Sequence, residues 1–427
     1  MLQLEHYKYD AARCVGCKGC VWVDHIYMPG VQFGMKCPSA ACYLFDSYAP
    51  YGRMKIALAV MEGRLPYSDK LADIVYSCTM CGACDAGCKR NLDLEPLLLL
   101  EAFRQRCVAQ GYILPQHRAV AERIRATHNY FGRSHEDRAR WWPEDVKKTG
   151  RGKGDVLYFT GCSSSYVHKE ISQSIIRLLQ KAKIAVTHLG SEEWCCGYSL
   201  VTTGQVEEAR HVAVHNIEAA LKSGAGTILV GCAECYKTWK VEYPKLLGKS
   251  TADMGYQVVH ASEYLAGLVQ DGTLAPGHAV PMKVTYHDPC NLGRLSEPWT
   301  HWEGTRGRFG TLQPPKEYRR GTYGVYEPPR QILNNIPGIE LVDMPRHREN
   351  AWCCGFGGGV RDAFPQLAGW AAGERVTEAQ SVGAEAIVSG CPWCKAGMQQ
   401  AVRESRSPVE VLDVVEVLAR AVLGRVG

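Results

Sequence analysis

From residue 155 onward, short apolar runs alternate with longer segments in which apolar residues recur every three or four positions. The runs at 155–161, 184–190 and 227–232 have the length and the flanking polar or glycine residues of buried strands. The segments at 169–182 and 205–224 have the spacing of amphipathic helices. Strands that alternate with helices in this way predict a parallel sheet with helices on its faces.

The last third of the chain repeats this pattern. It predicts strands at 283–290, 339–345 and 384–391, and helices at 328–338, 366–383 and 409–424. The N-terminal part differs, because its apolar segments have helical periodicity only, at 51–65, 93–111 and 115–132. The predicted fold class is therefore multi-domain α/β, with a helical N-terminal domain before two pseudo-repeated α/β domains whose sheets are mainly parallel.

Composition narrows the class of protein. Of the 427 residues, 46% are hydrophobic and 22% are charged, as in ordinary soluble domains. The net charge of +5 is small for this length, and no reader motif indicates nucleic acid binding. The N-terminus lacks the apolar core of a signal peptide, and no apolar run is long enough for a transmembrane segment. We expect a cytoplasmic protein that associates with a larger or membrane-attached complex.

Twenty cysteines in a chain without a leader indicate metal or redox chemistry rather than disulfides. Eight of them form two runs in the first 110 residues, Cys14, Cys17, Cys20 with Cys37, and Cys78, Cys81, Cys84 with Cys88. This is the bacterial ferredoxin spacing, in which the fourth cysteine crosses to the other cluster. It predicts one [4Fe–4S] cubane on Cys14, Cys17, Cys20 and Cys88, and another on Cys78, Cys81, Cys84 and Cys37.

Two departures leave the crossed ligation open: the gap before Cys37 is long, and Lys89 stands where proline usually follows Cys88. Zinc is the alternative metal. Zinc sites use four ligands, typically as two separated CxxC pairs or with histidines, so three cysteines at successive steps of three fit cubanes better. The domain organisation predicted is 1–110 for the helical ferredoxin-like domain, 111–154 for a linker, 155–280 and 281–427 for the α/β domains.

The linker is basic, with ten Lys or Arg against five Asp or Glu between residues 118 and 153. A solvated connector is the simpler interpretation, and a docking surface for an acidic partner is the other.

Ten further cysteines form two copies of one motif, a single cysteine, then CCG, then CxxC. The copies are Cys162, Cys195, Cys196, Cys232, Cys235 and Cys290, Cys353, Cys354, Cys391, Cys394. In each copy the single cysteine and the CxxC follow predicted strands, at the sheet end where ligands bind in parallel α/β folds. Gly197 and Gly355 allow a tight turn beside the site. Five thiolates exceed the four that a cubane or a zinc ion needs.

The second copy has about thirty extra residues, because Cys195 to Cys353 is 158 positions and Cys162 to Cys290 only 128. They lie near 295–326, a segment rich in aromatic and basic residues: Trp299, Trp302, Arg306, Arg308, Lys316, Arg319 and Arg320. We interpret this insertion as a docking loop, and a loop that forms a substrate pocket is the alternative.

The two C…CCG…CxxC motifs resemble the CCG domains of heterodisulfide reductases. A dicluster ferredoxin domain followed by two of them resembles the family of heterodisulfide reductase D subunits, over nearly the whole chain. The resemblance implies that each set of five cysteines holds a noncubane [4Fe–4S] cluster, and that the family's disulfide is split between the two clusters. The long second spacing departs from the family pattern and puts the substrate in doubt.

With two cubane and two noncubane clusters, the favoured function is electron relay within an anaerobic redox complex. The alternative is catalytic reduction of a heterodisulfide at the noncubane pair. Since the chain lacks flavin and quinone motifs, the resemblance implies partners such as a flavoprotein, a membrane cytochrome or an acyl-CoA reductase-type protein. No catalytic side chain is assigned, although His287 could hydrogen-bond a cluster sulfur or a substrate, or be purely structural.

Three lesser features are interpreted structurally. The glycine-rich segment 355–360 lacks the context of a dinucleotide loop, so we expect tight packing beside a cluster. Trp194 and Trp352, each before a CC pair, are expected to shield the clusters. Cys42 and Cys107 lie outside every motif and are expected to be buried apolar residues.

Overall fold

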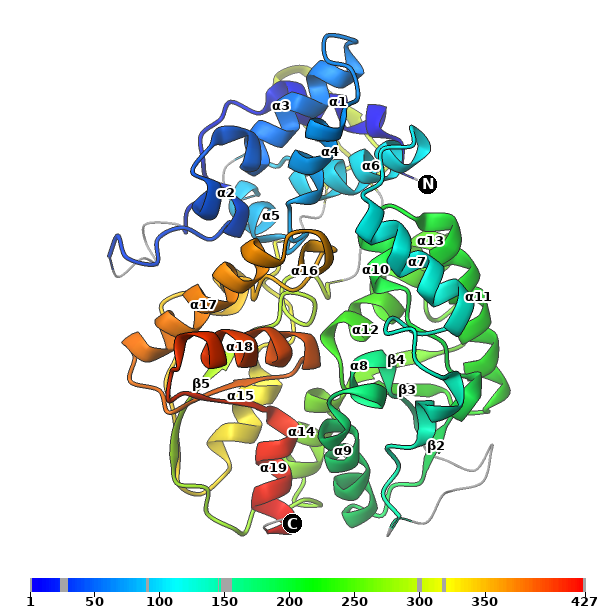
Figure 1. Cartoon of the computed structure of the whole chain (residues 1–427), viewed down its shortest axis with the longest axis vertical. Helices are drawn as coiled ribbons and strands as arrows, with labels where there is room; N and C mark the ends of the chain where they lie inside the picture. The colour runs from blue at the N-terminus through cyan, green and yellow to red at the C-terminus, as the bar shows by residue number, and fades with distance from the viewer. Residues whose placement is uncertain are drawn as a thin grey trace.

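A computed structural model describes residues 2–23, 30–89, 92–144, 146, 156–297, 302–316 and 320–424. A helical N-terminal region lies at one end, and two α/β halves lie beside each other below it (Figure 1). The polar stretch 147–154, as well as Trp299 and Arg319 of the insertion, lies outside the described residues.

The N-terminal region is built from short helices, and the sequence marks where several of them begin. They are α1 (Lys8–Arg13), α2 (Pro38–Tyr43), α3 (Pro50–Met61), α4 (Asp69–Tyr76), α5 (Ala83–Cys88) and α6 (Pro96–Ala109). Proline opens α2, α3 and α6, where its missing N–H costs nothing. Met54 and Phe103 pack into the apolar core of this region. Helix α7 (Pro115–Thr127) and the short 3₁₀ helix η3 (His135–Ala139) then lead along the α/β halves.

The first half contains one sheet of four parallel strands in the order β2-β1-β3-β4. The strands are β1 (Val156–Phe159), β2 (Val186–His188), β3 (Thr227–Val230) and β4 (Gln257–His260). The connecting helices are α8 (Gly161–Tyr166), α9 (Lys169–Lys181), α10 (Tyr198–Thr202), α11 (Val206–Lys222), α12 (Ala233–Lys237), α13 (Tyr243–Leu247) and α14 (Ala261–Gln270). Leu157 pairs with Ile228 at the sheet centre.

The second half repeats this topology. Strands β5 (Met282–His287), β8 (Ile339–Leu341), β9 (Ala386–Ser389) and β10 (Glu410–Asp413) form a parallel sheet in the order β10-β9-β5-β8. Its helices are α15 (Glu327–Asn334), α16 (Val360–Ala363), α17 (Pro365–Ser381), α18 (Pro392–Ser405) and α19 (Val414–Leu423). The predicted α/β class with parallel sheets is confirmed.

One predicted helix was wrong in its first part. The segment 409–424 begins with β10, which pairs with β9, and only then forms α19. The run VEVLDVV is β-branched and apolar, so its pattern suits either structure. Asp413 decides the boundary, because its side chain accepts a hydrogen bond from the Val415 N–H and Glu416 completes a capping box. Strand β4 corresponds to β10 and was not predicted.

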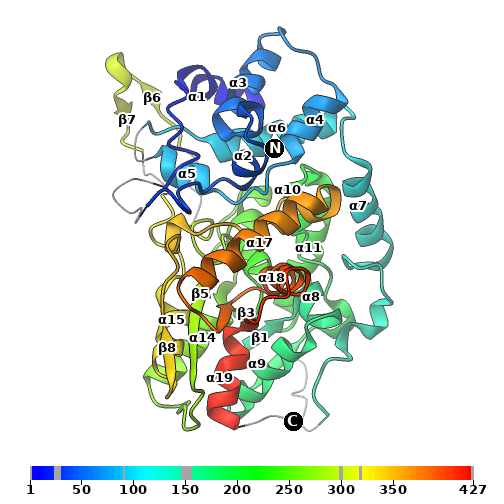
Figure 2. The same ribbon diagram turned by 60° about the vertical axis from the view of Figure 1, so that its left-hand side comes forward.

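The two halves are packed together through shared apolar cores. One core joins Tyr158 and Leu229 of the first sheet to Tyr286 and Val388 of the second. Helices α9 and α19 lie against each other across this junction (Figure 2). A second core contains cysteines of both halves, which places the two sheet ends close together.

The insertion forms a small antiparallel hairpin, β6 (Thr305–Arg306) and β7 (Leu312–Gln313). It lies against the N-terminal helical region near α1 (Figure 2). The Arg306 guanidinium lies 4.0 Å from the centre of the Tyr9 ring. Lys316 Nζ lies 2.5 Å from a Glu95 carboxylate oxygen and 3.7 Å from one of Asp93. Some of the basic residues of the insertion thus contact other parts of the same chain.

Candidate functional site

The two sets of five cysteines lie at the carboxyl ends of the parallel strands. We call Cys162, Cys195, Cys196, Cys232 and Cys235 the first cysteine set, and Cys290, Cys353, Cys354, Cys391 and Cys394 the second cysteine set. Cys162 follows β1 and Cys290 follows β5, at equivalent places in the two sheets. Cys232 and Cys391 are the N-cap residues of α12 and α18, where free N–H groups favour anionic ligands. All ten side chains are buried.

Within each set, the thiols lie next to one another in the same order. In the first set the contacts join Cys162 to Cys195, Cys195 to Cys196, Cys196 to Cys235, and Cys235 to Cys232. In the second set they join Cys290 to Cys353, Cys353 to Cys354, Cys354 to Cys394, and Cys394 to Cys391. The Sγ atoms of Cys354 and Cys394 are 3.3 Å apart. The repeat is therefore preserved at the level of individual sulfur contacts.

Two further contacts connect the sets. Cys232 of the first set touches Cys391 of the second, so the two sites adjoin across the junction of the halves. Cys353 of the second set touches Cys81, a cysteine of the ferredoxin-like run. An unbroken series of sulfur contacts therefore runs from the N-terminal region through the second set to the first.

The CCG turns show why glycine is needed. Gly197 and Gly355 have φ of 83° and 85°, in the left-handed region. A Cβ on Gly355 would lie 2.6 Å from the Ala368 carbonyl oxygen. Their N–H groups donate to the Cys195 and Cys353 Sγ atoms at 3.5 and 3.4 Å. The turn thus presents hydrogen-bond donors to sulfur, as a cluster site requires.

The ferredoxin-like cysteines form two groups. We call Cys14, Cys17, Cys20 and Cys88 the outer cubane set, and Cys37, Cys78, Cys81 and Cys84 the inner cubane set. Cys88 lies near Cys14 and Cys17. Cys37 lies near Cys78 and Cys81. Each fourth cysteine thus lies near the cysteines of the other run, as crossed ligation requires. Among the eight thiols only that of Cys17 is exposed.

The donor sets fit the clusters that the motifs predict. Thiolates are soft ligands that suit iron–sulfur clusters. Four or five of them are gathered at each place, away from water except at Cys17. Of the two cysteines outside the motifs, Cys107 is fully buried as predicted, whereas Cys42 is only half-buried. Cys42 lies at the end of α2, where its side chain packs against only one small apolar cluster.

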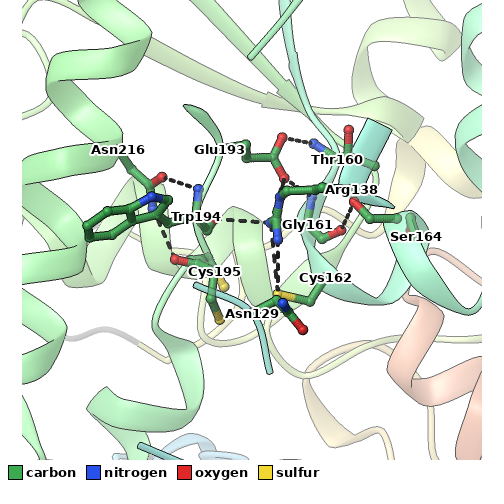
Figure 3. A network of polar contacts seen from close by, with 12 residues as sticks. Asn129, Arg138, Thr160, Gly161, Cys162, Ser164, Glu193, Trp194, Cys195 and Asn216 are labelled. Atoms are coloured by element: carbon green, nitrogen blue, oxygen red, sulfur yellow. Dashed lines mark hydrogen bonds and ion pairs between the residues drawn. The ribbon is translucent and has the colours of Figure 1, made fainter. Parts of the chain in front are cut away.

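A buried ion pair from the linker completes the first site (Figure 3). Arg138, in η3, donates to the Glu193 Oε1 atom from Nη2 at 2.8 Å, and its guanidinium nitrogens lie 3.8 and 3.9 Å from the Cys162 Sγ. Glu193 also accepts from the N–H groups of Thr160 and Gly161 at the end of β1, at 2.8 and 2.9 Å. The linker therefore supplies a cation to the first cysteine set.

Asn216 holds the CC segment from the other side. Its Oδ1 accepts from the Trp194 N–H at 3.1 Å, and its Nδ2 donates to the Cys195 carbonyl at 3.0 Å. The Trp194 ring is stacked between His128 and His215, with ring centres 3.9 and 3.6 Å away. Sequence reasoning missed Arg138, Glu193 and Asn216, because no local pattern links them to the cysteine motifs.

His287 belongs to the second site. Its Nδ1 accepts a hydrogen bond from the Arg375 Nε–H at 3.0 Å, so a neutral ring carries its proton on Nε2. The ligand atoms of His287, Cys354 and Cys394 all lie within 4.8 Å of one another. Hydrogen bonds from Cys353, Cys394 and His287 hold the pKa of Cys354 well below its usual value, against the effect of burial. In the first site Phe159 occupies the equivalent place, so the two sites differ here.

A cavity at the first set is lined by all five of its cysteines and by Tyr130, Glu234, Arg361 and Trp393. Arg361 comes from α16 of the second half. Its guanidinium lies 3.2 Å from the Glu234 carboxylate and 3.7 Å from the centre of the Trp393 ring. Burial raises the pKa of Glu234 to about 8, in spite of Arg361. Glu234 and Trp393 are equivalent positions of the two CxxC motifs, so this rim is asymmetric.

The glycine-rich segment 355–360 packs tightly, as predicted. A Cβ on Gly358 would lie 2.6 Å from the Thr79 carbonyl carbon, and the Gly358 carbonyl accepts from Arg104 Nη1 at 2.7 Å. The segment thus brings the second half against the loop that carries Cys78 and Cys81.

Comparison with known proteins agrees with this arrangement. The 4Fe-4S dicluster domain model matches residues 10–92, and the cysteine-rich CCG domain model matches 156–240 and 312–399. The second CCG match thus begins after Cys290, within the insertion. The D subunit of the dihydromethanophenazine:CoB–CoM heterodisulfide reductase of Methanosarcina barkeri is 32% identical over 96% of this chain and 93% of its own length.

The chain belongs to the family of heterodisulfide reductase D subunits. The D subunit from Methanosarcina acetivorans is 34% identical, again over 96% of this chain and 93% of that protein. The B subunit of the fumarate reductase (CoM/CoB) of Methanothermobacter marburgensis is 29% identical over 81% of this chain and 61% of its own length. The family predicted from the cysteine motifs is confirmed.

Membership in this family makes the chain an iron–sulfur oxidoreductase subunit with [4Fe–4S] domains. None of the helices in the described ranges is long and apolar enough to cross a membrane.

Proposed function

We propose that this member of the D-subunit family transfers electrons within an anaerobic redox complex, between cubane and noncubane [4Fe–4S] sites. The observation that supports this most directly is the series of sulfur contacts from Cys81 to Cys353, and from Cys391 to Cys232. A chain that only stored metal would have no need to place three cysteine groups in contact. Bound clusters would supply one-electron redox chemistry at these places.

The proposed ligands follow the four groups of cysteines. The outer and inner cubane sets would each hold a cubane, with Cys88 and Cys37 exchanged between the runs. The first and second cysteine sets would each hold a noncubane cluster. This assignment corresponds to about sixteen irons per chain. Anaerobic iron and sulfide analysis tests it, and stoichiometric zinc with little iron would contradict it.

The proposed order of electron transfer begins at the outer cubane set. Cys17 and Val15 are exposed there, with 73% of Val15 accessible. The inner cubane set, the second cysteine set and the first cysteine set then follow in the order of their contacts. Partners that exchange electrons with the exposed end are proposed to be a flavoprotein, a membrane cytochrome or an acyl-CoA reductase-type protein.

Rapid mixing with a reduced viologen, followed by freeze-quench EPR, tests this order. Because the cysteines of the two CCG sites are buried, most electrons should enter at the outer cubane set. In Cys84→Ser the noncubane signals should therefore appear much more slowly than in the wild type. Cys107→Ser is the control, since it changes a buried cysteine outside every motif. An unchanged rate in Cys84→Ser would refute the proposed order.

The insertion is proposed to contribute to partner docking. Its Lys316 bridges to Glu95, which also binds Lys89 beside Cys88, so the loop reaches the surroundings of the outer cubane set. Deleting 299–323 with a short Gly/Ser bridge should abolish co-purification of the partner, while iron content survives. If the complex persists and only disulfide reduction is lost, the loop forms a substrate pocket instead.

A second candidate function is disulfide reduction at the noncubane pair. It is favoured by the cavity at the first set, where Arg361, Glu234 and Tyr130 surround the cysteines. The test is reduction of a heterodisulfide by the isolated, cluster-containing chain with an artificial donor. Activity that is lost in Arg361→Gln would favour this function, and no activity in the wild type would count against it.

A further inference from the structure

Three buried arginines differ from the others in having no carboxylate partner. Seven of the described arginines are classed as buried residues, and four of them, Arg138, Arg330, Arg346 and Arg375, lie within 4.0 Å of an Asp or Glu oxygen. For Arg53, Arg104 and Arg294 no such oxygen is found in the described part of the chain. A buried charge without a countercharge is strongly unfavourable, so these cations need an anionic partner other than a carboxylate.

Arg53 lies beside Cys37. Its Nη1 donates to the Ser39 Oγ at 3.0 Å, and this hydroxyl lies 3.7 Å from the Cys37 Sγ. Its Nη2 donates to the Ser77 Oγ at 2.9 Å, directly before Cys78. Burial raises the pKa of the Cys37 thiol to about 11, and the positive charge of Arg53 opposes this rise.

Arg104 lies beside Cys78. Its Nη2 donates to the Cys78 carbonyl at 2.6 Å and to the carbonyls of Val75 and Tyr76, each at 3.1 Å, at the end of α4. Its Nη1 donates to Thr202 and Gly358 carbonyls at 2.7 Å, one from each α/β half. Its Nε is buried without a partner among the described residues.

Arg294 lies between the inner cubane set and the second cysteine set. Its Nε donates to the Cys81 carbonyl at 2.7 Å, and its Nη1 to the Ala351 carbonyl at 2.6 Å. Its Nη2 is buried with no partner in the described ranges. The charge acts on the thiols of Cys81, Cys290 and Cys353. Each of the three arginines thus lies next to a cysteine of the inner cubane set.

The outer cubane set has a different environment. Lys89, buried next to Cys88, is neutralised by Asp85 and Glu95 at 3.1 and 2.8 Å. Lys36 is buried too, and it interacts with other residues of the chain. Lys18, between Cys17 and Cys20, is 55% exposed and lies 3.9 Å from Asp46. Among the described residues, the buried arginines without a carboxylate partner therefore all lie at the inner set.

We propose that Arg53, Arg104 and Arg294 form a cationic cage that gives the inner cubane site a higher reduction potential than the outer one. Reduction adds one negative charge to a cluster, and buried cations stabilise it more strongly than exposed or paired ones. Electrons that enter at the exposed end would then collect at the inner site, next to Cys353. This inference rests on the ligand assignment proposed above.

An anaerobic redox titration followed by EPR tests the cage. The EPR signal that is lost in Cys17→Ala belongs to the outer site, and the signal that is lost in Cys81→Ala belongs to the inner site. In the wild type the inner signal should develop at the higher potential. Arg294→Gln should lower the reduction potential of the inner site by about 59 mV, which corresponds to a tenfold change in the equilibrium constant of a one-electron reduction. Arg294→Lys keeps the charge and should retain most of the wild-type potential.

Arg106→Gln is the matched control. It removes an exposed arginine, paired with Glu5, from the same helix as Arg104, and should leave both potentials unchanged. Arg53→Gln repeats the test beside Cys37. If the outer signal of the wild-type protein develops at the higher potential, the proposed cage is refuted. This outcome does not depend on whether the variants fold. Failure of Cys81→Ala to remove a cubane signal would instead refute the proposed ligands.

Discussion

Replacing Arg138 by methionine should destabilise the chain strongly. The Arg138 and Glu193 side chains are each 2% exposed, so water screens their attraction very little. Removal of one partner from a buried pair costs about 3–5 kcal/mol, because the other charge stays behind. We expect the lower end, about 3 kcal/mol, since the N–H groups of Thr160 and Gly161 still stabilise the Glu193 carboxylate.

The assay is anaerobic thermal unfolding of the full chain, with iron content measured in parallel. A loss of about 3 kcal/mol should lower the midpoint by roughly 6–12 °C if the first half unfolds as a unit of its size. The iron of the first cysteine set should be lost at the same time. In the Arg138→Met, Glu193→Gln double variant, part of the stability should return, because the buried charge has been removed as well.

The control is Arg140→Met, two positions away. Arg140 and Asp137 form a pair 3.0 Å apart whose side chains are 70% and 36% exposed, and such pairs contribute about 0–1 kcal/mol. If Arg138→Met lowers the midpoint no more than Arg140→Met does, the buried pair does not support the first site as argued.

Four other substitutions have specific expected outcomes. Cys84→Ser should remove one cubane EPR signal and leave the noncubane signals, and loss of the noncubane signals alone would refute the separation of the sites. Gly355→Ala should cost at least about 1–2 kcal/mol and lower the iron content of the second site, because φ is 85° there. Gly373→Ala, in open space within α17, should instead stabilise by about 0.5–1 kcal/mol. Burial lowers the pKa of His117 from 6.5 to about 4, so the unfolded chain binds a proton that the folded chain does not. Stability should therefore fall by about 3 kcal/mol as the pH falls from 6.5 to 4, and His117→Gln should abolish that part of the pH dependence in urea titrations.

Much of the site was predictable because cluster ligands are close in sequence. The steps of three in Cys78, Cys81 and Cys84 are readable without a fold, since one turn of backbone must present several thiols to one cluster. The same holds for the CCG turns, where Gly355 is required by a local backbone conformation. Strand and helix periodicity then predicted that Cys162 and Cys290 end equivalent strands, and the structure places them so.

The limits of local pattern are visible at β10. Its residues Glu410–Asp413 have a pattern that suits a helix as well as a strand, and pairing with β9 decides between them. The insertion shows the same limit. Its basic residues predicted a docking loop, but their pattern gave no sign that Arg306 and Lys316 also contact Tyr9 and Glu95 within the chain.

The sequence by itself determined the family, the cysteine groups and the repeated α/β plan, because these depend on residue types at short separations. Only the tertiary structure decided which cysteine group touches which, and which cations accompany them. Arg294 meets Cys81 across 213 positions, and Arg104 meets Gly358 across 254. Such contacts follow from how whole domains pack, where shape and burial select among many possible partners, and no spacing in the chain encodes them.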